Sequence, residues 1–315
     1  MADRSQAVVE TTVTPPPVRP VAAGPAEVAA ETAMPQATVL SVPATALVYR
    51  HAAPVRLLHW LNALSLFILI MSGLQIFNAH QALYWGERSD RDRPWLSIRA
   101  VKDDSGEMHG VTTIAGRSFD TTGLLGYSDG SRRGFPAWAT VPSGKWLAMG
   151  RQWHFFFAWV FVLTGLSFAV YGVASRHFGR ELVPTARDWR NLGRDLVNHL
   201  KFAHPTGEEA KRYNVLQKLA YSGILFVVAP TIVLTGLTMS PWVDAGFPQL
   251  LTLFGGRQSA RSIHFLACFA FVGFIVVHLF MVLTTGLANN LRSMLTGWYR
   301  ITLAGGTHDA ESSSR

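Results

Sequence analysis

Cysteine and charge are both scarce in this sequence. Cys268 is the only cysteine, which excludes an intramolecular disulfide, a covalently attached c-type haem and a cysteine-ligated iron–sulfur cluster. Only 15% of the residues are charged, against about a quarter in a typical soluble domain. Aliphatic, aromatic and sulfur-containing residues make up 49% of the chain. This balance excludes an ordinary water-soluble globular protein.

Four stretches without Asp, Glu, Lys or Arg account for the missing charge. They are Leu57–Phe77, Trp153–Ser175, Leu219–Val243 and Ser262–Leu291. Each exceeds the roughly 20 residues that a helix needs to cross a hydrocarbon core of about 30 Å. The sequence therefore predicts an all-α integral membrane four-helix bundle.

The remaining segments divide the chain into a membrane domain, residues 47–300, and two tails. Residues 1–46 are rich in Pro, Ala, Val and Thr and are predicted to be a disordered tail. Residues 301–315 form a polar tail. Two long loops connect the spans, residues 78–152 and residues 176–218.

The distribution of basic residues predicts the orientation. The loop 176–218 carries nine Lys and Arg against five acidic residues, which favours the cytoplasmic side. Both termini then lie in the cytoplasm and the loop 78–152 lies outside, in a multi-pass protein of the bacterial cytoplasmic membrane. The net charge is +8, and the basic residues flank the spans, as expected for contact with anionic lipid rather than nucleic acid.

Four histidines lie within the spans, where an ionisable side chain is costly unless it has a function or a partner. They are His59, His154, His264 and His278. His264 and His278 are 14 residues apart, which corresponds to about 21 Å along a helix and a rotation about 40° short of four turns. They therefore share one helix face, near opposite membrane surfaces.

Helix direction then matches the other two histidines to these depths. His59 pairs with His278 toward the cytoplasm, and His154 pairs with His264 toward the outside. Two imidazoles from opposite sides are the axial ligands of a low-spin haem, so the pairs predict two b-type haems between the helices. The alternative for each histidine is a hydrogen bond to a neighbouring helix.

An arginine stands three residues before three of these histidines, namely Arg56, Arg151 and Arg261. This offset places each guanidinium on the same helix face, one turn nearer the interface, where it would pair with a haem propionate. The alternative is an arginine that flanks a span and extends toward the headgroups.

A Ser/Thr-Gly-Leu sequence occurs in every span. Gly73 is 14 residues from His59 and Gly165 is 11 residues from His154, so both return to the histidine face at the depth of the other haem. A flat macrocycle needs such clearance, although small residues equally serve helix–helix packing.

Asn214, Gln217 and Lys218 share a face at the cytoplasmic entrance of the third span. They are candidates for hydrogen bonds to a quinone carbonyl beside the inner haem. Ordinary polarity at a helix end is the alternative.

These motifs resemble a known family, the bacterial di-haem cytochrome b subunits of formate dehydrogenase, nickel–iron hydrogenase and thiosulfate reductase complexes. The resemblance covers about residues 48–300 and rests on Arg56-Leu-Leu-His59-Trp60, Arg151-Gln-Trp-His154, Tyr213-Asn214 through Gln217-Lys218, and the His264-x13-His278 spacing. It implies that the four histidines ligate haem and that Asn214 and Gln217 lie by a quinone site. It also implies electron transfer between the quinone pool and an extracytoplasmic catalytic partner of molybdopterin oxidoreductase, formate dehydrogenase or hydrogenase type.

The loop 78–152 departs from the formate dehydrogenase type because it is much longer, and cytochromes that accompany periplasmic molybdopterin oxidoreductases are similar in this respect. Its many aromatic residues suggest that it caps the outer haem and docks the partner. Two other functions remain open. One is a self-sufficient redox enzyme acting on a small molecule at the outer haem, and the other is a small membrane transporter.

Overall fold

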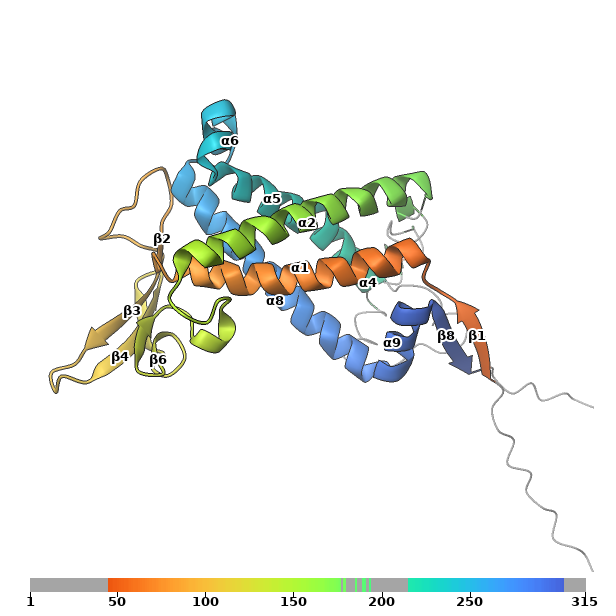
Figure 1. The fold of residues 1–315 in the computed structure, drawn as a ribbon, viewed down its shortest axis with the longest axis horizontal. Helices are drawn as coiled ribbons and strands as arrows, with labels where there is room; N and C mark the ends of the chain where they lie inside the picture. Colours follow the sequence, from red (N-terminus) through yellow and green to blue (C-terminus); the bar gives the residue numbers. More distant parts are fainter. Residues whose placement is uncertain are drawn as a thin grey trace, which may run out of the picture. The chain divides into compact units, whose positions relative to one another are not determined.

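The computed structural model describes residues 45–176 and 215–302, together with residues 178, 179, 185, 189, 190 and 193 between them. All of these belong to one unit of the chain, residues 43–315. Figure 1 shows long helices, with strands β2–β6 near one of their ends and β1 and β8 near the other.

Four helical segments are long and apolar enough to cross a membrane. They are α1 (Ala53–Phe77), α2 (Leu147–Ala174), the third span (Val215–Thr238) and α8 (Arg257–Thr284). The shortest has 24 residues and, at about 1.5 Å per residue, exceeds the hydrocarbon thickness of about 30 Å. The predicted fold class, a membrane bundle of four apolar helices, is confirmed.

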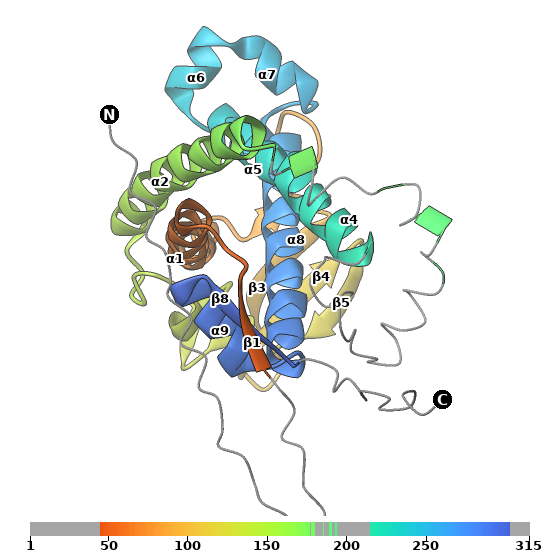
Figure 2. The same cartoon turned by 90° about the vertical axis from the view of Figure 1, so that its right-hand side faces the viewer.

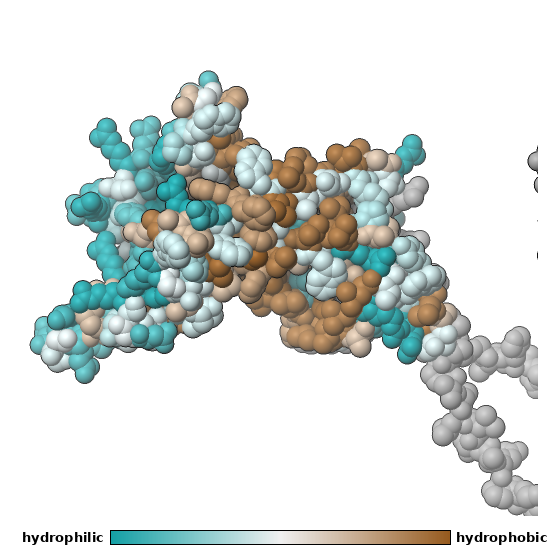
Figure 3. Space-filling view, viewed as in Figure 1, coloured by the Kyte–Doolittle hydropathy of each residue, from teal (hydrophilic) through white to brown (hydrophobic). Residues whose placement is uncertain are grey.

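The surface of these helices is apolar. Phe67 on α1, Trp159 on α2 and Val276 on α8 are each at least 60% exposed. Figure 3 shows apolar side chains gathered over the middle of the helices and hydrophilic ones toward the ends. Such a surface is unfavourable in water but suits lipid.

The third span changes helix type before Pro230. It begins as α4 (Val215–Gly223), continues as the π-helix η4 (Ile224–Val228) and ends as α5 (Ala229–Thr238). Proline lacks an N–H group and crowds the carbonyl group four residues earlier, here Phe226 within η4. Each of the other three spans is a continuous α-helix.

Two short helices follow the third span, and each has proline in its first turn. They are α6 (Pro241–Gly246) and α7 (Pro248–Leu253). Proline is well suited to the start of a helix because the missing N–H would have no partner there. The span accordingly covers Val215–Thr238, where the sequence predicted residues 219–243.

The fourth apolar run is divided between two helices. The sequence predicted one span from Ser262 to Leu291, but α8 ends at Thr284 and α9 (Leu287–Thr296) starts a separate helix. Gly286 between them has a φ angle of 106°, which is readily adopted only by glycine. The sequence remains free of charged residues on both sides of this turn, so hydropathy did not reveal it.

The four spans form two closely packed pairs. α1 packs along α2, and α5 packs along α8, whereas close backbone contacts between the two pairs are few. Figure 2, which looks along α1, shows α2 beside α1 and α5 beside α8. The two pairs are therefore two layers that face each other.

The segments before α1 and after α9 pair with each other. β1 (Thr45–Tyr49) and β8 (Trp298–Thr302) form an antiparallel ladder in which Tyr49 lies opposite Trp298. The predicted tails of residues 1–46 and 301–315 overlap this ladder by two residues at each boundary. The rest of both tails lies outside the described residues.

The loop 78–152, for which the sequence predicted a capping role but no secondary structure, contains two small antiparallel sheets and a 3-10 helix, η1 (Ala137–Ala139). The larger sheet has the order β2-β3-β4-β5, and the smaller one joins β6 to β7. The strands are β2 (Ala82–Leu83), β3 (Leu96–Lys102), β4 (Met108–Ile114), β5 (Arg117–Asp120), β6 (Gly126–Ser128) and β7 (Ser131–Arg133). We call residues 78–146 the outer cap, and we name the two ends of the bundle outer and inner after the predicted orientation.

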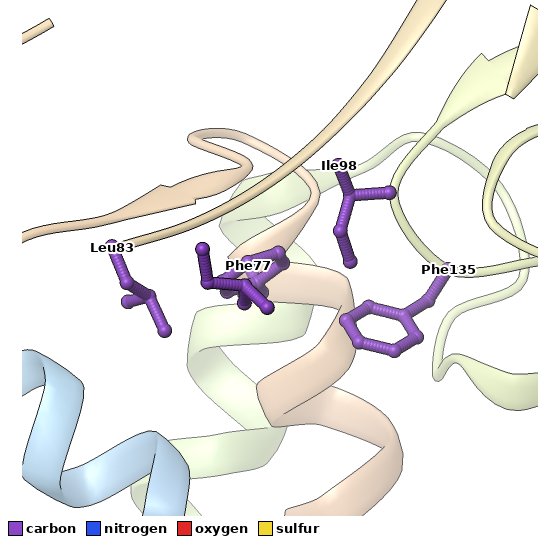
Figure 4. Close-up of a cluster of buried hydrophobic side chains, with 5 residues drawn as sticks. Phe77, Leu83, Ile98 and Phe135 are labelled. Atoms are coloured by element: carbon purple, nitrogen blue, oxygen red, sulfur yellow. The ribbon is translucent and has the colours of Figure 1, made fainter. Parts of the chain in front are cut away.

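A cluster of buried apolar side chains joins the outer cap to the end of α1. Phe77 from α1 packs with Leu83, Leu96, Ile98 and Phe135 from the cap, all at most 7% exposed. Figure 4 shows Phe77, Leu83, Ile98 and Phe135 converging above the helices. The cap is thus a folded part of the domain and not a flexible connection.

Arg133 is buried in the outer cap and fastens it to α1. Its guanidinium donates hydrogen bonds to the carbonyl groups of Phe135 (2.6 Å) and Ser143 (2.8 Å) and to Thr140 Oγ1 (2.7 Å). It also donates to Oε1 of Gln75 on α1 (3.3 Å). One cation therefore satisfies acceptors from three parts of the cap and from the membrane helix.

We predict that Arg133→Ala destabilises the outer cap by roughly 2–3 kcal/mol, because several buried acceptors lose their donor. Limited proteolysis or hydrogen exchange of residues 82–140 in lipid nanodiscs measures this effect. Arg132→Ala, at the exposed neighbouring position, is the control. Equal protection in both variants would show that Arg133 does not hold the cap.

Candidate functional site

The four span histidines meet in two pairs across the layers. His59 on α1 faces His278 on α8, with ring centroids 6.3 Å apart and ring planes at 54°. His154 on α2 faces His264 on α8, with the same centroid distance and an angle of 62°. The structure thus brings together the two pairs that helix direction predicted.

The spacing within each pair suits a metal ion between two imidazoles. A metal–imidazole nitrogen bond is about 2 Å long and the ring centroid lies roughly 1 Å behind the nitrogen, so two in-line axial ligands place their centroids about 6 Å apart. Both observed distances are 6.3 Å. The residues present therefore fit an iron held axially by each pair.

The outer pair is held by hydrogen bonds at Nδ1. His264 Nδ1 lies 3.0 Å from the carbonyl oxygen of Ile232 and 3.2 Å from Thr235 Oγ1, both in the third span. His154 Nδ1 lies 3.1 Å from Ser72 Oγ on α1. A proton on Nδ1 satisfies these contacts and leaves the Nε2 lone pair available to a metal.

Glycine residues in the neighbouring helices allow both outer imidazoles to approach the helix backbone closely. A Cβ atom on Gly73 would meet His154 Cε1 at 3.4 Å, and one on Gly236 would meet His264 Cε1 at 3.2 Å. Gly73 therefore makes room for an axial histidine, while a Cβ on Gly165 would meet nothing within 4 Å. Open space at Gly165 is compatible with the predicted clearance for a macrocycle.

The same arrangement occurs in both halves of the bundle. In α1, Ser72-Gly73 receives a histidine from α2, and in α5, Thr235-Gly236 receives a histidine from α8. The Ser/Thr-Gly-Leu sequences mark these positions, but the sequence alone predicted a role only for their glycines. The hydroxyl groups of Ser72 and Thr235 are site residues that sequence reasoning missed.

The inner pair has a different surrounding. His59 Nδ1 is buried and has no hydrogen-bond partner among the described residues. The His59 ring packs edge-on against Trp60 at 5.3 Å, and the His278 ring stacks on Phe274 at 5.7 Å. Aromatic contacts, rather than hydrogen bonds, position these two rings.

Two arginines near the inner end carry buried donors without partners. Arg56 donates from Nη1 to the carbonyl oxygen of Leu295, yet its Nε has no partner among the described residues. Nη1 of Arg292 on α9 is likewise buried and unsatisfied. Buried guanidinium N–H groups without acceptors suit an anionic ligand such as a propionate. The sequence predicted this role for Arg56 but did not include Arg292, which follows the turn at Gly286.

Arg151 and Arg261 differ from each other. Arg261 donates to the carbonyl groups of His80 and Ala82, the latter at 2.9 Å, so part of its guanidinium fastens the outer cap to α8. Arg151 is exposed and lies over the Phe155 ring at 5.6 Å. Both stand one turn from an outer histidine, as the sequence predicted.

His80, in the cap segment beside Arg261, has a lowered pKa. Burial, followed by the charges of Arg261 and Arg91, lowers the pKa of His80 below its usual value of 6.5. The His80 ring is therefore neutral at pH 7.

Among the predicted quinone residues, Gln217 and Lys218 lie in the first turns of α4, where Lys218 is only 7% exposed and Gln217 is half-buried. Asn214 lies outside the described residues. The structure therefore gives two of the three positions, at the start of the third span.

Comparison with known proteins gives one family and several relatives. The family model described as prokaryotic cytochrome b561 matches residues 50–297. The chain is 27% identical over 234 residues to a protein-methionine-sulfoxide reductase subunit, YedZ1, of Azospira oryzae, covering 74% of this chain and 89% of that protein. It is 23% identical over 242 residues to a Ni/Fe-hydrogenase B-type cytochrome subunit of Cupriavidus necator (74% and 77% covered) and 24% identical over 265 residues to one of Azotobacter vinelandii (80% and 88% covered).

We predict that Gly236→Val lowers the haem b content of the purified chain, because the added side chain displaces the His264 imidazole. The pyridine haemochrome assay measures haem per chain. Gly273→Val is the control, since Gly273 is exposed on α8 and a Cβ there meets nothing within 4 Å. Full haem content in the Gly236 variant would contradict the close approach of His264.

Proposed function

The chain belongs to the prokaryotic cytochrome b561 family, and from that premise we propose that it carries electrons across the bacterial inner membrane between two b-type haems. It would connect an extracytoplasmic catalytic subunit to the quinone pool. One observation carries this proposal: two pairs of facing imidazoles lie at two depths along α8, each with a centroid distance of 6.3 Å.

The separation of the pairs supports transfer between them. His264 and His278 are 14 residues apart on one helix, so the two sites are about 21 Å apart along its axis. When bound, each haem supplies a one-electron iron couple. The protein contributes the axial imidazoles, the apolar surrounding and the guanidinium groups at the inner end.

The proposed orientation places the loop 176–218 and both termini in the cytoplasm. The ladder of β1 with β8 supports a common side for the two ends, because it joins the chain before α1 to the chain after α9. The excess of Lys and Arg in the loop 176–218 supports the cytoplasmic side. A quinone would then bind near Gln217 and Lys218, beside the inner haem.

The names of the relatives suggest what kind of partner to expect. They are described as subunits of a methionine sulfoxide reductase and of nickel–iron hydrogenases. We propose that this chain likewise serves a separate catalytic subunit outside the membrane, of hydrogenase, formate dehydrogenase or molybdopterin oxidoreductase type. A self-sufficient redox enzyme at the outer haem is the main alternative. A transporter receives less support, because the interruption at η4 has no counterpart in α1, α2 or α8.

The proposal predicts two haems b per chain, and one after His154→Ala, because His59 and His278 still face each other in that variant. Pyridine haemochrome analysis and redox titration in detergent measure the number of low-spin components. His109→Ala is the control, since this histidine lies in the outer cap between Asp103 and Asp120. A single haem in the wild type, or loss of both in a folded His154 variant, would refute the di-haem proposal.

We further predict that Trp138→Ala combined with Trp146→Ala prevents co-purification of the catalytic subunit from native membranes while both haem spectra persist. These side chains are 70% and 57% exposed on the outer cap, and exposed tryptophan is a frequent anchor of protein interfaces. Both substitutions are at the surface, so they leave the buried cluster of Leu96, Ile98 and Phe135 intact, which a deletion of the loop would remove.

Trp242→Ala serves as the comparison, because Trp242 is 81% exposed on α6, the other connection at the outer end. If only this variant releases the partner, the docking surface is at α6 and not on the cap. Retention of catalytic activity by the chain purified without any partner would favour the self-sufficient enzyme.

A further inference from the structure

The imidazoles of the two histidine pairs differ in the hydrogen bonding of their Nδ1 atoms. From this difference we infer that Ser72 and Thr235 are positioning residues that give the outer haem a lower reduction potential than the inner haem. The inference rests on the proposed di-haem function. It adds two residues and an order of potentials that the histidine pattern alone does not contain.

Ser72 can only accept a hydrogen bond from His154. Its hydroxyl group donates to the carbonyl oxygen of Ile68 (2.7 Å), as a serine inside a helix commonly does. The remaining lone pairs face His154 Nδ1 at 3.1 Å. Since Ser72 is fully buried, no water competes for this contact, and the proton must reside on Nδ1 of the histidine.

Thr235 repeats this geometry in the other half of the bundle. Its hydroxyl group donates to the carbonyl oxygen of Thr231 (2.7 Å) and faces His264 Nδ1 at 3.2 Å. The carbonyl oxygen of Ile232, 3.0 Å from the same nitrogen, is a second acceptor. Thr235 is also fully buried. Both outer imidazoles are thereby fixed as the tautomer that presents Nε2 to a metal.

The inner pair lacks this support on at least one side. Nδ1 of His59 is buried without a hydrogen-bond partner among the described residues. Its neighbours are the Trp60 ring and the His278 ring. An imidazole in this surrounding is oriented by packing, and no acceptor among the described residues attracts a proton on its Nδ1 and thereby raises the electron density of the ring.

A hydrogen bond donated by Nδ1 makes the opposite nitrogen a stronger base. A more basic axial ligand stabilises ferric iron more than ferrous iron, so the reduction potential falls. Two such ligands act at the outer site. An electron shared between the haems therefore resides preferentially on the inner one, and transfer from the outer face toward the cytoplasm is energetically downhill.

Redox potentiometry of the full chain in lipid nanodiscs tests this order with four variants. Ser72→Ala and Thr235→Val each remove a hydroxyl acceptor, whereas Ser72→Thr keeps the hydroxyl group at position 72. Ser65→Ala is the matched control, because Ser65 is also a fully buried serine on α1, and its hydroxyl group donates only to the carbonyl oxygen of Leu61 among the described residues.

We expect the lower-potential component to shift upward in Ser72→Ala and Thr235→Val, while the higher-potential component stays in place. The shift is about threefold in the reduction equilibrium constant, about 30 mV for a one-electron couple, because backbone acceptors remain. The g values of the ferric low-spin signal of the same component should change. Ser72→Thr and Ser65→Ala should match the wild type, and the component absent from His154→Ala should be the lower one.

The outcomes separate this inference from the proposed function. Two haems with unchanged potentials in both hydroxyl variants, or a shift of the higher component, would overturn the inference and leave the di-haem proposal intact. An equal shift in Ser65→Ala would assign the effect to general packing and also overturn it. A wild-type chain with fewer than two haems would refute the di-haem proposal itself.

Discussion

Histidines of one helix layer face histidines of the other with ring centroids 6.3 Å apart in both pairs, and the candidate site depends on this facing arrangement. α1 packs on α2 and α5 packs on α8, yet the layers meet through His59 with His278 and His154 with His264. α8 contributes one histidine to each pair. Because the spans bury little apolar surface against one another, lipid and, under the proposed function, bound haem would supply much of the cohesion.

Several long-range hydrogen bonds fasten the outer cap to the ends of α1 and α8. Ser262 on α8 donates to the carbonyl oxygen of Tyr84 (2.6 Å) and accepts from Trp95 Nε1 (2.9 Å). Arg261 binds two more carbonyl groups of the outer cap, and Arg133 binds the cap to Gln75 on α1. These contacts surround the helix turn that carries His264. The cap is therefore fastened to both α1 and α8, next to the helix turn that carries His264.

The repeat of Ser72-Gly73 and Thr235-Gly236 links local sequence to the chemistry of the site. Glycine lets an imidazole approach the helix backbone, and the preceding hydroxyl group accepts its Nδ1 proton. The inner site has neither feature at His59, and it relies on aromatic packing and on the arginines Arg56 and Arg292. The two histidine pairs thus have different surroundings, and under the proposed function this difference would separate the potentials of two haems.

The sequence by itself determined the membrane class, the four apolar spans and the depth of each histidine, because hydropathy and the rise of 1.5 Å per residue are local properties. It also identified which histidines face each other, since helix direction alternates at every crossing. The ladder of β1 with β8 was decided by tertiary structure alone, since it pairs residues distant in sequence. The strands of the outer cap and the break at Gly286 are more local, but hydropathy did not reveal them. Tertiary structure likewise decided that Ser72 and Thr235 accept from the outer histidines. A hydroxyl group in an apolar helix has several acceptors and donors within reach, and only the packed neighbouring helix selects among them.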